Sequence, residues 1–244
     1  MELLLIAVGI FVGILSGFFG IGGGTVSVPI LLYMGFDIKQ AIGISVFQML
    51  LGSILGFFIH RKSGTYDASK KVYFGYGGIV GAIIGAYMVK VLNHDILEWL
   101  FLALVVFTLV KLFLSNPQPS KEEIYNPYIY TAIGFGIGIF SGMLGVGGSI
   151  LMTPILVSFL GFSLKKASAV GLFFVIFSSF SSFVSLSFLG MMDYRNGLLL
   201  GIGSLLGIWI GIWLLHKIKI THYKKFFVVF YVFIFLITAN KIIG

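Results

Sequence analysis

The chain has 244 residues, of which 59% are hydrophobic and only 10% are charged, whereas soluble domains carry about 25% charged residues. This composition excludes a soluble domain, because no soluble core could hide so much apolar surface, and it predicts a chain whose solvent is lipid. Cysteine is absent, which excludes a disulfide framework and a cysteine metal site. The net charge of +8 suggests either nucleic acid or a membrane face as partner.

Stretches without charged residues or histidine define the predicted membrane helices, since a helix crosses a bilayer in about 20 residues. In chain order they cover residues 3–36, 40–59 and 72–89, a weaker segment at 96–114, and then 124–164, 167–192, 196–215 and 226–240. The period-two alternation of a membrane barrel is missing. Because no basic segment precedes the first stretch, we interpret it as a retained helix and not as a signal peptide. We therefore predict an all-α polytopic membrane protein.

The sequence repeats on either side of a polar stretch that contains two prolines, residues 115–126. The segment SGFFGIGGG at 16–24 recurs as SGMLGVGGS at 141–149, PIL at 29–31 recurs at 154–156, and glycines at 75, 77, 81 and 85 recur at 201, 203, 207 and 211. Duplicated halves are a common plan of secondary transporters. We predict a first transmembrane repeat (1–114), a cytoplasmic linker (115–126) and a second transmembrane repeat (127–244).

The basic residues distinguish two topologies, because cytoplasmic loops carry an excess of Lys and Arg. If the helices on either side of each glycine cluster form one crossing, the repeats run parallel and the basic residues divide 8 to 8. If they go in and come back, as two spans or as a re-entrant pair, the repeats are inverted and the division is 12 to 4. The second model is favoured, with both termini outside and the linker inside, so the positive charge indicates topology and not nucleic acid.

The two glycine clusters predict broken helices at membrane depth, because a helix cannot run smoothly through so many glycines. Irregular backbone is tolerated there only where it is buried in protein or lines a cavity. The short helix after each cluster, shaped by Pro29 or Pro154, would present free N–H groups and a positive dipole end, which suits a small anion. The alternative is that the glycine clusters only allow helices to pack closely. Close packing is also our interpretation of the separate small-residue stripes at 9, 13 and 17, at 77, 81 and 85, and at their repeat equivalents.

Polar side chains on the helix that follows each short helix predict a path for the anion. The helix at 40–59 has Ser45 and Gln48 on one face, and its counterpart has Gly171, Ser178 and Ser182. Ordinary hydrogen bonding between helices explains these residues about as well. Asp67 and Asp193, matched across the repeat, are interpreted as helix caps more readily than as gates.

The absence of other motifs narrows the function. Because no ionisable residue lies deep in the first three segments of either repeat, a side-chain proton relay in mid-membrane is not expected. No catalytic or nucleotide-binding motif is found, so we predict that the protein is not an enzyme and that it needs no cofactor or metal.

The paired Ser-Gly-x-x-Gly-x-Gly-Gly motifs, each followed by Pro-Ile-Leu, together with AIGIS at 41–45 and the Gly64-x-x-Asp67 turn, resemble the TauE/SafE sulfite exporter family over residues 5–240. The resemblance implies a multipass inner-membrane carrier of sulfite, sulfonates or other small organosulfur anions. The second repeat departs from the first at Gly171, where the first has Ser45, and at Ser149, where the first has Gly24. The two half-sites would therefore be unequal.

We thus predict a transporter that moves a small anion, a sulfur oxyanion or an organosulfonate such as sulfite or a sulfoacetate-like compound, across the cytoplasmic membrane by alternating access. A channel-like pore and a non-transporting scaffold are the alternatives, and a homo-oligomer is compatible with the sequence. The predicted substrate-binding residues are Gly22, Gly23, Gly24, Thr25, Ser45, Gln48, Gly147, Gly148, Ser149, Thr153, Ser178 and Ser182.

Overall fold

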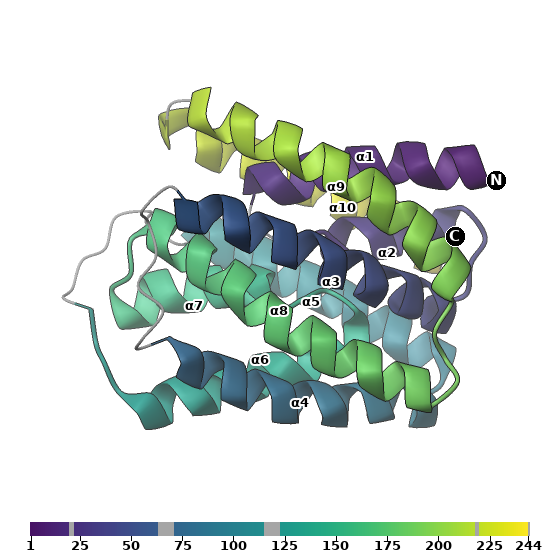
Figure 1. Cartoon of the computed structure of the whole chain (residues 1–244), viewed down its shortest axis with the longest axis horizontal. Helices are drawn as coiled ribbons and strands as arrows, with labels where there is room; N and C mark the ends of the chain where they lie inside the picture. Colours follow the sequence, from purple (N-terminus) through teal and green to yellow (C-terminus); the bar gives the residue numbers. More distant parts are fainter. Residues whose placement is uncertain (20–21, 63–70, 115–122, 218–219, 244) are drawn as a thin grey trace.

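Figure 1 shows a computed structural model of the chain, which describes residues 1–19, 22–62, 71–114, 123–217 and 220–243. These residues form helices and contain no strand, which confirms the predicted all-α class. The helices are α1 (Glu2–Phe19), α2 (Gly24–Tyr33), α3 (Ile38–Lys62), α4 (Val72–Val91), α5 (His94–Leu114), α6 (Pro127–Leu144), α7 (Ser149–Leu160), α8 (Leu164–Phe188), α9 (Tyr194–Lys217) and α10 (Ile220–Ile243).

Helix length separates two short helices from the rest. Among the described residues, α3, α4, α6, α8 and α9 contain stretches long and apolar enough to cross a membrane. In contrast, α2 has 10 residues and α7 has 12, which at 1.5 Å per residue reach only about half of a bilayer core that is roughly 30 Å thick. Neither could cross alone. Each repeat therefore begins with a longer helix joined through a glycine turn to a half-length helix, and three longer helices follow.

The glycine stripes join the two repeats to each other. A Cβ on Gly13 of α1 would lie 2.2 Å from the carbonyl oxygen of Ser204 in α9, and a Cβ on Gly81 of α4 would lie 2.1 Å from that of Phe135 in α6. The backbones touch at these positions, and no larger residue fits without separating the helices. The sequence left open whether the stripes pack within a repeat or between repeats; the structure shows that they pack between repeats.

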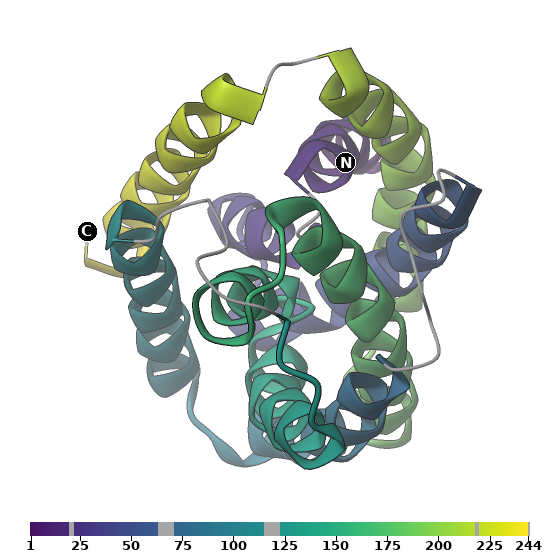
Figure 2. The same ribbon diagram turned by 90° about the vertical axis from the view of Figure 1, so that its left-hand side faces the viewer.

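Six helices form a row in the order α1, α9, α3, α8, α4 and α6, each packed against the next. This order is reciprocal: the first helix of each repeat packs on the fourth helix of the other, and α3 and α8, the equivalent third helices, meet in the middle. Figure 2 shows the row as an arc, with α5 and α10 on the opposite side and the short helices α2 and α7 between them. Both short helices are largely buried.

The outer face of the bundle is apolar. On α9, for example, Leu206, Trp209 and Trp213 are all more than half exposed, although a monomeric soluble protein rarely exposes a continuous patch of this kind. Together with the five apolar spans, this surface fits a multi-pass membrane protein surrounded by lipid.

Both chain ends lie at the same end of the molecule, on the right in Figure 1. There Arg195, at the start of α9, forms an ion pair with Glu2, at the start of α1. A second ion pair joins Lys166 of α8 to Glu123 before α6. In each pair both residues lie at or just before the start of a helix, outside the apolar spans.

Candidate functional site

Two glycine turns interrupt the helices where the sequence predicts broken helices. In the first turn Gly22 and Gly23 have φ values of 78° and 84°, and in the second Gly147 and Gly148 have φ values of 73° and 74°. These left-handed conformations are strained for residues with a Cβ. The glycines therefore allow the chain to reverse and begin α2 and α7 inside the bundle.

The two turns contact each other. A Cβ on Gly24 would lie 2.1 Å from the carbonyl oxygen of Gly145, and a Cβ on Gly22 would lie 3.5 Å from Oγ of Ser149. Residues 22–24 and their repeat equivalents 147–149, together with Gly145, thus share one location between α3 and α8.

The helices that start at these turns have uncapped N-termini. Four other helices have a side-chain cap that accepts hydrogen bonds from first-turn N–H groups: Asp37 for α3, Asn126 for α6, Ser163 for α8 and Asp193 for α9. Asp193 is therefore a cap, as predicted, while Asp67 lies outside the described residues. By contrast, Gly23 and Gly148 precede α2 and α7 and offer no side chain. The first N–H groups of a helix have no acceptor within it, so α2 and α7 direct theirs, with their positive dipole ends, at the shared location.

Pro29 and Pro154 occupy the sixth position of α2 and α7. A proline has no N–H, so the carbonyl four residues earlier, that of Thr25 or Ile150, loses its usual donor. The first turn of each short helix, next to the glycine turn, therefore lacks one of its usual backbone hydrogen bonds.

Three of the predicted hydroxyls already have partners in the protein. Ser45 accepts from Oγ of Ser27 at 2.9 Å and donates to the carbonyl oxygen of Gly145 at 2.7 Å. Ser178 accepts from Oγ of Ser141 at 3.2 Å and lies 3.4 Å from the carbonyl oxygen of Gly147. These two serines hold the turns in place.

The third hydroxyl, that of Thr153, donates to the carbonyl oxygen of Ser149 within its own helix.

Four other predicted residues are different, because their polar atoms are buried and unpartnered. Among the described residues, Oγ1 of Thr25, both amide atoms of Gln48, and the hydroxyls of Ser149 and Ser182 have no hydrogen-bond partner, although at most 1% of each residue is exposed. Each such group costs about 1–3 kcal/mol, and native proteins leave few of them.

The amide of Gln48 lies directly against the first turn. A Cβ on Gly23 would lie 2.7 Å from Nε2 and 2.8 Å from Oε1 of Gln48. In the second repeat Phe174 takes the equivalent place, since a Cβ on Gly148 would lie 2.6 Å from its ring. The two half-sites are therefore unequal: the first offers an amide and the second an aromatic ring.

Sequence reasoning missed two apolar side chains that pack against both turns. Val175 lies next to Gly22 and Gly147, and Sδ of Met49 lies next to Gly24 and Gly147. Met49 and Val175 are equivalent across the repeat, as are Gln48 and Phe174, so extending the repeat offset along α3 and α8 would have found them. The polar stripe alone could not, because these residues are apolar.

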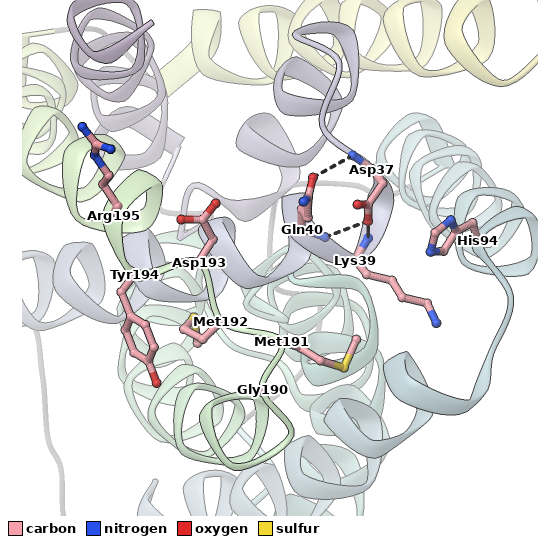
Figure 3. Close-up of a pocket in the computed structure, with 10 residues that line it drawn as sticks. All are labelled: Asp37, Lys39, Gln40, His94, Gly190, Met191, Met192, Asp193, Tyr194 and Arg195. Atoms are coloured by element: carbon pink, nitrogen blue, oxygen red, sulfur yellow. Dashed lines mark hydrogen bonds between the residues drawn. The ribbon is translucent and has the colours of Figure 1, made fainter.

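Figure 3 shows a separate pocket of about 530 Å³. Arg195 lines it and pairs with Glu2, so the pocket lies at the end of the molecule where α1 begins. It lies between the loops that precede α3, α5 and α9. Its charged groups have other roles, since Asp37 and Asp193 cap helices, Arg195 pairs with Glu2, and Nζ of Lys39 donates to the carbonyl oxygen of Lys90. We therefore place the candidate site at the glycine turns.

Comparisons with known proteins identify the family of this chain. The family model described as sulfite exporter TauE/SafE matches residues 5–238. A "probable membrane transporter protein" of Methanocaldococcus jannaschii is 30% identical over 193 residues, which cover 75% of this chain and 71% of the relative. The "probable membrane transporter protein YunE" of Bacillus subtilis is 26% identical over 231 residues, covering 84% and 85% of the two chains. No solved structure matches.

Proposed function

Because the chain belongs to the sulfite exporter TauE/SafE family of membrane transporters, we propose that it carries a small sulfur oxyanion or organosulfonate across the cytoplasmic membrane by alternating access. The anion binds at the two glycine turns. The first N–H groups of α2 and α7 and the unpartnered side chains hold it, while Ser45 and Ser178 keep the turns in position.

The observation that carries this proposal is the coincidence of uncapped helix ends with unpartnered polar groups. Thr25, Gln48 and Ser149 are fully buried, and Gln48 and Ser149 each lie beside a glycine of the first turn. Polar groups in lipid-embedded protein need partners. An anion whose oxygens accept from these N–H, O–H and amide groups supplies them and is in turn stabilised by two helix dipoles.

We further propose that the repeats, residues 1–114 and 127–244, are inverted and joined by a cytoplasmic linker, with both termini outside. What supports this is the grouping of loops at one end. Lys39 and Arg195 line the same pocket, whereas parallel repeats would put these two residues on opposite faces of the membrane. The 12-to-4 distribution of basic residues supports a cytoplasmic position for the opposite end.

Uptake into proteoliposomes containing the purified protein tests the function. A panel of sulfite, thiosulfate, alkyl sulfonates, sulfate and simple carboxylates is expected to show saturable uptake of at least one sulfur oxyanion or sulfonate. Flux that rises linearly with concentration would indicate a pore, and no flux of any sulfur compound would overturn the proposed substrate class.

A further inference from the structure

We infer that the transported anion carries one negative charge and one O–H donor, and that each chain binds one such anion, beside Gln48. This inference rests on the proposed function and narrows its substrate class. Three independent features support it: the charge available at the turns, the acceptor atom of the Gln48 amide, and the inequality of the two half-sites.

The charge at the site comes from backbone dipoles alone. Among the buried residues that the structure describes, Lys71, just before α4, is the one charged side chain. Its ammonium group lies over the ring of Phe162, 5.7 Å from the ring centroid. The segments that form the turns and the facing parts of α3 and α8 contain no ionisable residue. Two helix N-termini supply about +0.5 charge each, which balances a monoanion and leaves a dianion half compensated in a medium of low dielectric constant.

The amide of Gln48 requires a donor as well as an acceptor. Nε2 donates to an anion oxygen, and the hydroxyls of Thr25 and Ser149 can rotate to do the same. Oε1 of Gln48 can only accept, yet it is buried without a partner. An anion made of acceptors alone leaves Oε1 unsatisfied, whereas an anion with an O–H group satisfies both amide atoms.

Phe174 closes the equivalent place in the second repeat. Its ring packs against Gly148 and Gly78 and has no hydrogen-bonding group. The single anion that the two helix N-termini balance therefore lies on the side of Gln48, where an amide and not an apolar ring faces it. Hydrogensulfite and a hydroxyalkyl sulfonate both have the required chemistry, while sulfate, doubly ionised sulfite and sulfoacetate-like dianions lack it.

Isothermal titration of the purified chain with two sulfonates of equal charge tests the donor requirement. We expect 2-hydroxyethanesulfonate to bind about tenfold more tightly than ethanesulfonate, as one lost hydrogen bond to a buried acceptor implies, with about one molecule bound per chain. In Gln48→Met, which keeps the side-chain length and removes the amide, this ratio falls towards one. Thr108→Val, which removes a hydroxyl bonded within its own helix, leaves the ratio unchanged.

The pH dependence of sulfite binding is a second test of the same inference, because hydrogensulfite loses its proton near neutral pH. The apparent Kd for total sulfite is expected to rise about tenfold per pH unit above that transition, while the Kd of 2-hydroxyethanesulfonate stays constant. If only sulfite binds, the pH series alone decides between hydrogensulfite and sulfite.

Three outcomes would overturn the inference and leave the proposed function standing: equal binding of the two sulfonates, pH-independent binding of sulfite, or binding of sulfate as tight as that of the best monoanion. If folded protein binds none of these probes, the proposed function itself fails together with the inference.

Discussion

The polar residues around the glycine turns form two sets: a bonded set, with hydrogen-bond partners in the protein, and an open set, without them. Ser45 and Ser178 connect the turns to α3 and α8, while Thr25 and Gln48 have no partner among the described residues. The sequence predicted all four, since the polar stripe and the repeat depend only on residue type and spacing. It could not separate the sets, because Ser45 bonds to Gly145, a residue 100 positions away.

Replacing Thr25 with valine tests the open set. The change removes an unpartnered buried hydroxyl and keeps the shape of the side chain, so the ligand-free protein should be as stable as the wild type or more stable. Binding of the transported sulfur anion should weaken about tenfold, because a donor to the anion is lost. Thermal unfolding in detergent and calorimetric binding check the two effects.

Thr108→Val and Ser45→Ala are the controls for this variant. Thr108 bonds to the carbonyl oxygen of Leu104 in its own helix, so its replacement should leave binding unchanged. Ser45→Ala removes the donor to the carbonyl oxygen of Gly145 and should destabilise the protein by about 1 kcal/mol. A clear loss of stability in Thr25→Val without loss of binding would contradict the assignment of Thr25 to the site.

Helix positions were predictable from the sequence, because uncharged stretches mark apolar spans and glycine clusters mark breaks. Helix partners were not. A stripe of small residues shows that a helix packs closely but does not identify its neighbour, and the structure pairs α1 with α9 and α4 with α6 across the repeats. Since each repeat is held to the other through these pairs, we expect that the sequence repeats do not move as separate bodies. We expect instead that α1, α9 and α3 move against α6, α4 and α8.

Two glycines of α6 test the close packing. A Cβ on Gly134 would lie 2.2 Å from the carbonyl oxygen of Phe74 in α4, whereas a Cβ on Gly136 meets nothing within 4 Å. Gly134→Ala should therefore destabilise the protein by about 1–3 kcal/mol, and Gly136→Ala should not. Equal melting temperatures of the two variants in detergent would show that α4 and α6 do not pack as described.

Cross-linking tests which helices move together. The chain has no cysteine, so a short bifunctional thiol reagent links only the two cysteines that are introduced. Joining positions 39 and 90, where Nζ of Lys39 reaches the carbonyl oxygen of Lys90, ties α3 to α4 and should block uptake. Joining positions 2 and 195, the ion pair between α1 and α9, should leave uptake intact. Block by the second link, or normal uptake with the first, would contradict this division.

At the scale of the whole molecule, the proposed orientation rests on the distribution of Lys and Arg. Ser120→Cys lies in the predicted cytoplasmic linker. Asn93→Cys lies between α4 and α5, beside His94, which lines the same pocket as Arg195. In sealed cells an impermeant thiol reagent should label position 93 and leave position 120 unlabelled until the membrane is opened. The reverse pattern would invert the orientation, and labelling of both positions would contradict the proposed topology.

Backbone N–H groups and neutral side chains at the two glycine turns are proposed to hold the anion. Anomalous diffraction from crystals grown with selenite, the selenium analogue of sulfite, locates the anion directly. One selenium peak per chain is expected within hydrogen-bonding reach of the first turn of α2 and the amide of Gln48, and this peak should be lost in Gln48→Met. A peak confined to the surface pocket beside Lys39, or two equal peaks at the two turns, would contradict this proposal.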